Sequence, residues 1–531
     1  MRTSTSLNRR NFLAGSGAAL VAGAASVSLA HADETAAGQV DDTEAQLVIV
    51  GSGMGGLCAG VEALQQGLTN VVIVEISKWT GGGSSWAYGA IHAGSAGKTD
   101  ETFDEFTQYE GTDELSHTVF NGFQPLLHWV DEDLHLPVQI NWDIDTPFCH
   151  MLNADGVANP TSTRYFFDKF VELFESLGGQ IMMQTRAKRL VTDEAGAVTG
   201  VVCENVEGET FTIKAGGVVL ATGGWQNDSE LKSRYLGPEG AQTTVMGTPY
   251  NTGSGLKMAT AVGASLQGNM SQWSGCFVAA EPAKNWMEDV EAYEQYGYDE
   301  EVGGKWWLYD TVFDTMQSTA IWVNSEGKRF TDENLPGLAA KQIVSRQRRS
   351  SMVVIMDQAG WDEWMATPAC SLIADETKLL DIITSDEVGG AYFSADTIED
   401  LADQLNAAGP ATYKVHKANL VKTIEEYNAA AEAGTGEDLF PPKSGTTNCA
   451  AIVTPPFYAV PMRAAIYANY GGVAIDTSAR VLDVSRKPIP GLYATVPCAG
   501  GVFHEFYTGT IAGAGVTGRL AADAAAKAIL G

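Results

Sequence analysis

A short glycine-rich segment near the N-terminus has the residue types and the spacing needed to hold a phosphate group. Residues 51–56 read Gly-Ser-Gly-Met-Gly-Gly, which matches the pattern G-x-G-x-x-G, and Glu75 follows 19 residues after Gly56. In this pattern the first glycine makes a tight turn, the second lets backbone approach a pyrophosphate, and the third lets a helix pack against a strand. Glu75 would accept hydrogen bonds from a ribose diol, so the spacing predicts a dinucleotide site.

The elements around this turn are those that such a site requires. Residues 45–50 form a β-branched run typical of a buried parallel strand, and residues 71–74 form a second one that ends directly before Glu75. Residues 57–66 are compatible with a helix, whose N-terminal dipole would favour the negative charge of a pyrophosphate. The order strand, glycine turn, helix, strand predicts a doubly wound α/β domain. An ordinary glycine-rich turn is the alternative interpretation.

Further segments favour FAD over a nicotinamide cofactor. A second glycine–serine segment lies at residues 79–89, and it suits FAD because the isoalloxazine must be met by close backbone and small side chains. Residues 218–224 form a hydrophobic strand that ends in Ala-Thr-Gly-Gly, as the return strand of FAD-binding Rossmann proteins usually does. Residues 251–255 (Asn-Thr-Gly-Ser-Gly) then precede a helical stretch at 256–262.

Composition limits the classes of function. The 531 residues carry a net charge of −32, which makes binding to nucleic acid phosphates unfavourable. The hydrophobic fraction of 45% and the charged fraction of 18% are those of a globular protein. The seven cysteines form no C-x-x-C pair, which argues against a zinc ribbon, a ferredoxin-type cluster and c-type haem attachment. We therefore predict no metal site.

The first 32 residues have the features of an export signal. Paired arginines, Arg9 and Arg10, precede an Ala/Gly-rich apolar stretch, and residues 30–32 (Ala-His-Ala) form a small-x-small cleavage site. This pattern resembles a twin-arginine signal peptide, and a short membrane anchor is the alternative. No later segment has 18 uncharged apolar residues, so we expect no membrane span after cleavage. The predicted location is periplasmic or at the cell surface.

Taken in order, these motifs resemble the fumarate reductase/3-ketosteroid dehydrogenase family of FAD-dependent flavoproteins, over residues 45–527. The resemblance implies an α/β fold in which a doubly wound, Rossmann-type FAD-binding domain is interrupted by an α+β capping domain. It also implies noncovalent FAD and oxidoreduction at CH–CH groups. The expected division after the signal is an FAD-binding domain at 33–274 and 466–531, with a capping or substrate domain at 275–465. The C-terminal helix, at about 513–528, would point its N-terminal end at the flavin.

Groups that the fumarate branch of this family uses to clamp a dicarboxylate are missing. Residues 327–333 match the family motif G-x-R-F-x-x-E, but the proton-donating arginine expected four residues after Glu333 is replaced by Gly337. Residues 272–276 lack the expected histidine, residues 506–510 lack the Asn-Arg clamp, and residues 467–470 stand where a further histidine is usual. A dicarboxylate needs bidentate cations, so fumarate is disfavoured as the substrate.

The residues that fill these positions are phenolic or neutral, and Tyr507 resembles the tyrosine of the ketosteroid dehydrogenase branch. There a tyrosine hydroxyl and a backbone amide polarise a ketone. A second tyrosine or His504 could exchange the proton at the α-carbon, with Glu505 orienting His504. Two departures weaken the match: Ile511 replaces the amide-donating glycine, and Gly337 replaces a proton-transfer tyrosine. The predicted catalytic residues are Tyr507, His504, Tyr467 and Tyr470, although tyrosines are more often core residues.

The predicted FAD-binding residues share positions in the glycine turn, in the segments after the predicted strands, or at the start of the C-terminal helix. They are Gly51, Ser52, Gly53, Gly55, Gly56, Glu75, Gly82, Gly83, Ser84, Lys188, Ala221, Thr222, Gly223, Ser254, Ile511 and Ala512. His92 and His150 lie near these segments, and we expect no role for either.

The leading hypothesis is an exported FAD-dependent enzyme that moves hydride between flavin N5 and a conjugated C=C next to a carbonyl, in a steroid-like or other enone. An aromatic-rich cap (Trp286, Trp306, Trp307 and Trp322) suits such a substrate. We prefer the reductase direction, with electrons from a separate partner. One alternative is reduction of an unsaturated carboxylate related to cinnamate, urocanate or fumarate, for which Arg463 could supply a single cation. The other is a noncatalytic flavin-binding protein.

Overall fold

The computed structural model describes residues 42–531 except 88, 94–113, 143–147, 159–161, 282–289, 292, 294–318, 336, 367–382, 384–388, 445–448 and 505–508. Residues 39–531 form one compact unit. The predicted signal at 1–32 lies outside the described residues. Tyr507, Glu505 and three of the four tryptophans assigned to the cap (Trp286, Trp306 and Trp307) lie outside them as well.

The larger sheet is built on the two β-branched runs that the sequence identifies. Among the described residues it has eight strands, in the order β18-β19-β9-β1-β2-β6, with β7 and β8 attached through β9. From β19 to β6 the neighbouring strands in that order are parallel, whereas β18 is antiparallel to β19. The strands are β1 (Thr43–Val50), β2 (Val71–Val74), β6 (Gln180–Met182), β7 (Arg186–Thr192), β8 (Val198–Glu204), β9 (Thr210–Leu220), β18 (Arg480–Leu482) and β19 (Pro488–Ala494).

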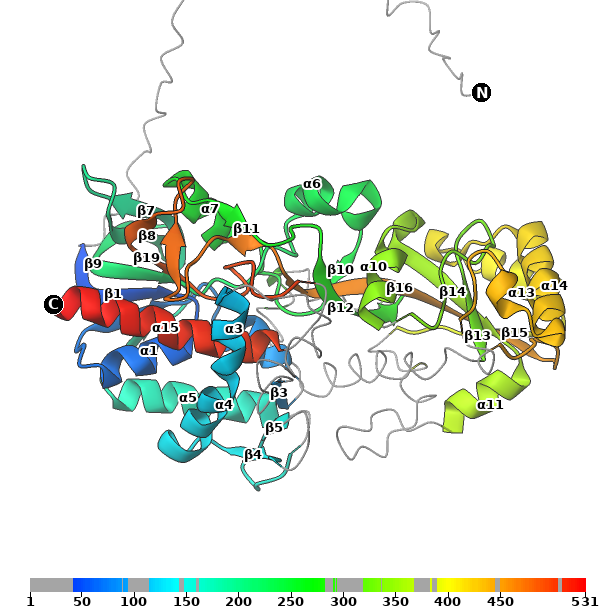
Figure 1. The fold of residues 1–531 in the computed structure, drawn as a ribbon, viewed down its shortest axis with the longest axis horizontal. Helices are drawn as coiled ribbons and strands as arrows, with labels where there is room; N and C mark the ends of the chain where they lie inside the picture. The colour runs from blue at the N-terminus through cyan, green and yellow to red at the C-terminus, as the bar shows by residue number, and fades with distance from the viewer. Residues whose placement is uncertain are drawn as a thin grey trace, which may run out of the picture. The chain divides into compact units, whose positions relative to one another are not determined.

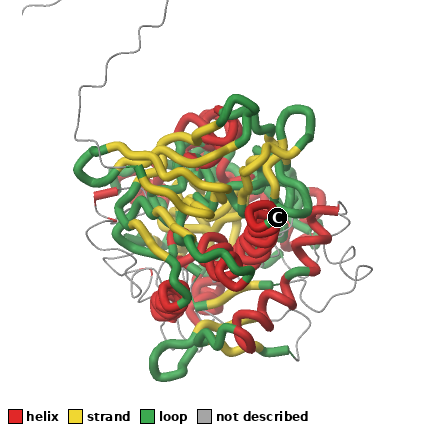
Figure 2. The backbone as a smooth tube through the Cα atoms, turned by 90° about the vertical axis from the view of Figure 1, so that its left-hand side faces the viewer, coloured by secondary structure: helices red, strands yellow, loops and turns green. Residues whose placement is uncertain are grey.

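The first and the last helix of the described residues pack together beside this sheet. Helix α1 (Met54–Gln65) contacts α15 (Thr510–Leu530), and the Nε atom of Arg519 donates to Glu62 Oε2 over 2.7 Å. Most of α15 is alanine and glycine, so the two helices approach closely and α15 also reaches β9 and β19 (Figures 1 and 2). The first and the last helix of the described residues therefore pack in one layer. Further helices of this part are α3 (Glu114–Asn121), α4 (Phe123–His128), α5 (Ser162–Ser176), α6 (Ser229–Gly240) and α7 (Ser254–Ala261).

A second sheet is centred on one long strand, β16 (Phe457–Asn469). Its order is β10-β16-β14-β13, and β12 and β15 also pair with β16. The other strands are β10 (Thr244–Val245), β12 (Trp273–Ala279), β13 (Ala320–Val323), β14 (Ser351–Met356) and β15 (Phe393–Ala395). The helices of this part are α10 (Gly337–Ser345), α11 (Gln358–Ala366), α13 (Ile398–Ala407) and α14 (Lys417–Ala433). Strand β10 lies before residue 275, so this sheet draws on sequence outside the predicted cap, whose boundaries stay a prediction.

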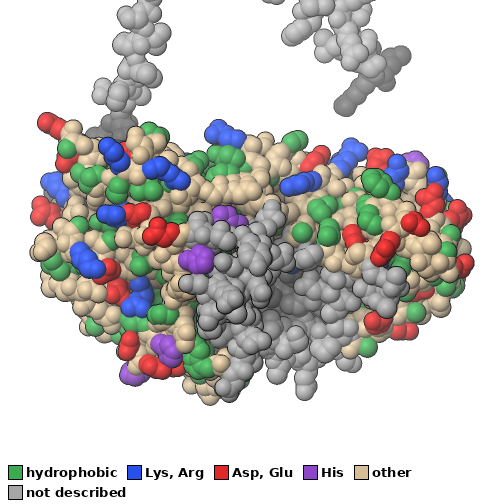
Figure 3. Space-filling model, viewed as in Figure 1, with side chains coloured by type: hydrophobic (Ala, Val, Ile, Leu, Met, Phe, Trp, Pro, Cys, Tyr) green, Lys and Arg blue, Asp and Glu red, His purple; other side chains and the backbone are tan. Residues whose placement is uncertain are grey.

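Small elements complete the described part of the chain. Strands β3 (Ala90–His92), β5 (Phe148–Met151) and β4 (Val138–Ile140) form a three-stranded antiparallel sheet, and β11 (Leu266–Gln267) pairs with β17 (Gly472–Val473). Single turns of 3-10 or π helix lie at Gly82–Trp86, Trp129–Asp133, Arg348–Ser350, Ala411–Tyr413 and Gly436–Asp438. None of the described helices has the length and apolar character needed to cross a bilayer. On the face shown in Figure 3, acidic and basic side chains are interspersed.

Candidate functional site

A deep cleft of about 500 Å³ opens where the loops of the larger sheet meet strands and helices of the second sheet. The glycine turn, the end of β2 and the N-terminus of α15 line one part of it. Met246, Tyr250, Tyr293, Lys341 and Tyr467 line the part that faces the second sheet. The cleft therefore joins the predicted dinucleotide site to residues of the predicted cap.

Glycine is needed in this turn for two different physical reasons. A Cβ on Gly51, whose φ is +108°, would lie 2.4 Å from the carbonyl oxygen of Ala221, and a Cβ on Gly56 would lie 1.9 Å from that of Gly51. The fold itself excludes side chains at these two positions. A Cβ on Gly53 would meet protein only at 3.5 Å, at Gly81 and Ser84, so it would extend into the cleft. Gly53 thus leaves room for a bound group.

Glu75 is fixed beside this turn at the end of β2. Its Oε2 atom accepts hydrogen bonds from the backbone N and the Oγ of Ser52, at 2.9 and 2.6 Å, and Oε1 accepts one from the backbone N of Ser77 at 2.9 Å. The residue is buried but lines the cleft. Helix α1 begins next to it, after Gly53, and its N-terminal end lines the cleft, where it favours an anion; the N–H of Met54 donates to Ser84 Oγ at 3.2 Å.

A family profile described as an FAD binding domain matches residues 46–517. The chain belongs to this family. The match includes the glycine turn, both sheets and the first residues of α15, and it confirms the predictions of FAD as the cofactor and of an FAD-dependent oxidoreductase. Attachment of FAD without a covalent bond stays a prediction.

Known proteins with related sequences span most of the chain. A probable fumarate reductase of Shewanella frigidimarina is 25% identical over 507 residues, which cover 93% of this chain and 76% of that protein. The vinyl phenol reductase of Lactiplantibacillus plantarum is 23% identical over 486 residues, covering 87% of this chain and 91% of that protein.

A solved structure shows the same fold. The 3-ketosteroid Δ1-dehydrogenase of Sterolibacterium denitrificans, in complex with 1,4-androstadiene-3,17-dione, superposes with a TM-score of 0.68 at 19% identity. The superposition covers 91% of this chain and the whole of that one. The predicted fold class, a Rossmann-type FAD-binding domain with a capping domain, is confirmed.

The residues that line the cleft suit FAD. Backbone around Gly53 and the first turn of α1 would hold the pyrophosphate, and Glu75 would hold the ribose of the adenosine half. Thirteen of the sixteen predicted FAD-binding residues line the cleft: Gly51, Ser52, Gly53, Gly55, Glu75, Gly82, Gly83, Ser84, Ala221, Thr222, Gly223, Ser254 and Ile511. Their roles toward FAD stay predictions.

Three residues of that predicted set do not line the cleft. Gly56 packs on the backbone of Gly51 instead. The Lys188 side chain is exposed and its Nζ binds Glu204 Oε2 at 2.9 Å on the neighbouring strand, whereas Thr185, Arg186 and Ala187 of the same segment reach the cleft. Ala512 is buried in α15. The side chains of Lys188 and Ala512 thus lie away from the cleft, and the roles of all three residues toward FAD stay predictions.

Of the four predicted catalytic residues, the structure describes three, and these have different surroundings. Tyr467 lines the cleft, and its phenol oxygen accepts a hydrogen bond from Ser274 Oγ at 2.6 Å. Tyr470 is only 2% exposed, packs on Phe503 with ring centroids 6.0 Å apart and does not line the cleft, and its catalytic role stays a prediction. His504 is described but does not line the cleft. Tyr507 lies outside the described residues.

A β-bulge accounts for the orientation of Tyr467. Strands β12 and β16 pair Ser274 with Ala468 and Gly275 with Ile466, so Tyr467 is the extra residue in between. Side chains alternate along a regular strand, but a bulge turns neighbouring residues to the same side. Tyr467 and Ala468 consequently both line the cleft.

Two histidines for which no role was expected also line the cleft. His92 lies on β3 and His150 on the paired strand β5. Burial lowers the pKa of His92 to about 4 and also lowers the pKa of His150. Both imidazoles are therefore neutral at pH 7. The sequence signal that could have identified them is their position one strand beyond the second glycine–serine segment.

Lys341 is a further lining residue that the sequence interpretation missed. It comes from α10, is 5% exposed, and has its Nζ atom 5.6 Å from the centre of the Phe277 ring. Arg463, the cation that the carboxylate alternative relied on, does not line the cleft. Its Nη2 atom donates to the carbonyl oxygen of Gln242 at 2.9 Å, and a role of Arg463 toward a substrate carboxylate stays a prediction.

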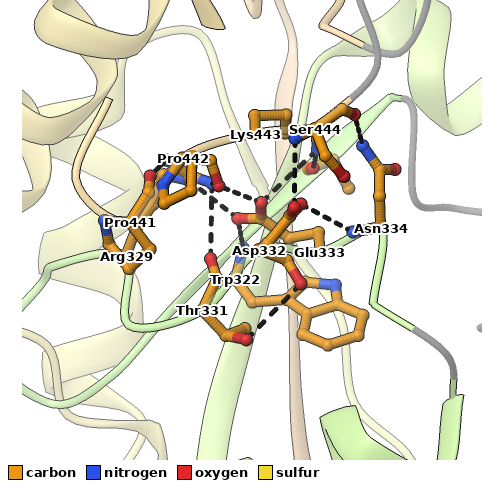
Figure 4. Close-up of polar contacts among 11 residues, drawn as sticks. Trp322, Arg329, Thr331, Asp332, Glu333, Asn334, Pro441, Pro442, Lys443 and Ser444 are labelled. Carbon is orange, nitrogen blue, oxygen red and sulfur yellow. Dashed lines mark hydrogen bonds and ion pairs between the residues drawn. The ribbon is translucent and has the colours of Figure 1, made fainter. Parts of the chain in front are cut away.

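A buried charge cluster fixes the segment that leads into α10 (Figure 4). Glu333 is fully buried and accepts two hydrogen bonds from Arg329, from Nε at 2.9 Å and from Nη2 at 2.6 Å. Lys443 Nζ lies 3.6 Å from the same carboxylate and donates to the carbonyl oxygen of Ala320. The backbone N of Trp322 also donates to Glu333. The motif at residues 327–333 thus ties β13 to the start of α10.

Proposed function

We propose that this protein uses FAD to reduce a carbon–carbon double bond conjugated to a ketone, in a substrate with a steroid-like or other apolar body. The observation that carries the proposal is the phenol of Tyr467 in the cleft. Ser274 Oγ donates to the phenol oxygen of Tyr467 at 2.6 Å, which holds the phenol where it lines the cleft.

Different residues of the cleft would contribute to different steps of the proposed reaction. Bound FAD supplies hydride exchange with a carbon atom of the substrate. Tyr467 would donate a hydrogen bond to the ketone oxygen as that oxygen gains negative charge. His92 and His150, neutral at pH 7, could offer hydrogen bonds to the substrate, and His504 and Tyr507 stay the candidates for delivering the proton to the α-carbon. Tyr250, Tyr293 and Met246 would contact the apolar body of the substrate.

The relatives support reduction of a double bond without requiring a dicarboxylate. One is named a probable fumarate reductase and the other a vinyl phenol reductase. A second candidate, reduction of an unsaturated monocarboxylate such as cinnamate, is favoured by one observation, the buried lysine in the cleft.

The test is anaerobic reoxidation of the reduced flavin. The purified FAD-loaded protein is reduced with dithionite and mixed with androstenedione, cinnamate, urocanate or fumarate while flavin absorbance is followed. We expect reoxidation by the enone. Reoxidation by carboxylates alone would replace the enone proposal with the second candidate. A flavin that stays reduced with every compound would leave the noncatalytic alternative.

Export and electron supply complete the proposal. Residues 1–32 would direct the folded, FAD-loaded protein across the cytoplasmic membrane, and a separate redox partner would deliver its electrons. Replacing Arg9 and Arg10 with lysine should keep the protein inside the cell, with residues 1–32 still attached. Normal export of that variant would contradict the proposed signal.

A further inference from the structure

The side chain of Asn251 is a buried carboxamide in the wall of the cleft. The residue lines the cleft and is only 5% exposed. Among the described residues, none forms a hydrogen bond with this carboxamide. Leaving buried amide N–H and C=O groups without partners costs free energy, so the partners have to come from what enters the cleft.

Neighbouring glycines make room for the carboxamide. A Cβ on Gly223, whose φ is +71°, would lie 2.2 Å from Asn251 Oδ1, so a side chain at that position would collide with the amide. A Cβ on Gly83 would lie 3.4 Å from Asn251 Nδ2. Both glycines line the cleft. The carboxamide therefore lies between the loop after β9 and the second glycine–serine segment.

Hydrogen bonds hold the backbone on both sides of Asn251. Its carbonyl oxygen accepts from the backbone N of Asn227 at 2.8 Å. Two residues later, the backbone N of Gly253 donates to the carbonyl oxygen of Gly224 at 3.0 Å. Two residues earlier, the carbonyl oxygen of Pro249 accepts from Asn227 Nδ2 at 2.8 Å. The carboxamide is thus positioned before a ligand binds, which lowers the entropy cost of binding.

The position of Asn251 distinguishes it from the residues at the adenosine end. Glu75 lies at the end of β2, where the sequence pattern places the adenosine ribose. Asn251 instead adjoins Tyr250, which lines the part of the cleft that faces the second sheet. FAD that fills the cleft displaces the water there, so a group of FAD has to replace the hydrogen bonds of that water.

The chemistry of a carboxamide narrows the choice of that group. The amide offers two donor hydrogens and one acceptor oxygen, so it pairs best with a partner that both accepts and donates. The pyrophosphate of FAD only accepts hydrogen bonds. The ribityl hydroxyls and the C=O and N–H groups of the isoalloxazine do both.

We propose that the Asn251 carboxamide binds the flavin half of FAD, accepting one hydrogen bond at Oδ1 and donating another from Nδ2. The inference rests on membership of the FAD-binding family and is independent of the substrate proposed above. It adds to the FAD site a residue that the sequence interpretation passed over, although Ser254 of the same segment was included.

The experiment compares Asn251→Leu and Asn251→Asp with the control Asn121→Leu, at an exposed asparagine on α3. The purified FAD-loaded protein is diluted, and the fluorescence of released FAD gives the Kd of FAD. Displacement of FAD by ADP gives the Kd of ADP, which has the adenosine and pyrophosphate groups but neither ribityl nor isoalloxazine. Glu75→Gln is the reference for a contact at the adenosine end.

We expect Asn251→Leu to raise the Kd of FAD about 10- to 100-fold, because two hydrogen bonds are lost, and to leave the Kd of ADP unchanged. Asn251→Asp keeps the shape of the side chain and should show the same pattern if the leucine variant does not fold. Glu75→Gln should raise both constants, and Asn121→Leu should match the wild type. An unchanged Kd of FAD in both Asn251 variants, or equal weakening of FAD and ADP, would overturn the inference.

The reduction potential of the flavin locates the contact within the flavin half. A carboxylate beside the isoalloxazine disfavours the negative charge of the reduced ring, so a contact to the ring predicts a lower potential in Asn251→Asp. A wild-type potential together with weaker FAD binding would support a contact to the ribityl chain. No substrate takes part in these measurements. A flavin that no enone or carboxylate reoxidises would therefore overturn the reductase proposal and leave the role of Asn251 intact.

Discussion

Ser274 Oγ donates a hydrogen bond of 2.6 Å to the phenol oxygen of Tyr467, across the β-bulge that turns Tyr467 into the cleft. Ser274 is fully buried, so no water competes for its hydroxyl. The bond holds the phenol where it lines the cleft. This pair links the packing of the second sheet to the proposed polarisation of the substrate.

Replacing Tyr467 with phenylalanine should lower kcat for enone reduction about 100- to 1000-fold, because a donor to the developing oxyanion is removed. Ser274→Ala should have a smaller effect, since the phenol stays but loses its orientation. The measurement is single-turnover reoxidation of the reduced flavin by androstenedione. Tyr392→Phe, at a tyrosine 39% exposed, is the matched control and should match the wild type. Full activity of Tyr467→Phe would remove this residue from the mechanism.

The two kinds of glycine in the turn predict opposite outcomes. Gly53→Ala should leave the free energy of unfolding of the FAD-free protein nearly unchanged but weaken FAD binding, because the new methyl group would extend into the cleft. Gly56→Ala should destabilise the protein by about 2–3 kcal/mol or more, since its Cβ would overlap the carbonyl oxygen of Gly51. Denaturant unfolding and the FAD content of the purified variants measure the two effects. Similar stability of both variants would contradict this distinction.

Breaking the buried charge cluster should be costly. Glu333→Ala would leave Arg329 and Lys443 buried without their carboxylate, and we expect a loss of about 3–5 kcal/mol in the free energy of unfolding. The matched control is Glu230→Ala, which removes the carboxylate of an exposed pair with Arg234 and should cost less than about 1 kcal/mol. Denaturant titrations compare the two variants. A loss for Glu333→Ala no larger than for the control would show that the cluster does not stabilise the fold.

The parts of the fold that the sequence predicted are those determined by local patterns. The strand expected at 45–50 is part of β1, the strand at 71–74 is β2, and the helix expected at 57–66 is α1 at Met54–Gln65. Here the glycine turn and the β-branched runs act within about thirty residues of one another. Their close agreement also explains why thirteen of the predicted FAD-binding residues line the cleft.

The residues of the substrate end could not be predicted in the same way. Tyr467 depends on a bulge between strands almost 200 residues apart in the sequence, with Ser274 as its partner. Lys341 reaches the cleft because of how α10 packs on β12, which no local pattern of the helix specifies. The spacing of Tyr470 from Tyr467 in the sequence likewise does not indicate that Tyr470 is buried against Phe503. Long-range packing, rather than residue type, decides these positions.

The pKa values of the cleft histidines predict how stability depends on pH. Burial lowers the pKa of His92 to about 4, below the value of about 6.5 for an unfolded chain. Between these values the unfolded protein binds a proton that the folded protein does not. The stability is therefore fully present above pH 6.5 and is lost as the pH falls toward 4, by up to about 3 kcal/mol for this residue. His150 acts in the same direction.

Replacing His92 with asparagine should flatten this loss, because the variant has no imidazole to protonate on unfolding. The free energy of unfolding of the FAD-loaded protein is measured by denaturant titration from pH 7.5 to pH 4. His135→Asn, at an exposed histidine, is the control and should keep the wild-type slope. If His92→Asn loses stability as steeply as the control below pH 6.5, protonation of His92 is not what destabilises the fold in acid. A flatter curve confined to His92→Asn would instead establish that the folded cleft keeps this imidazole neutral at pH 7.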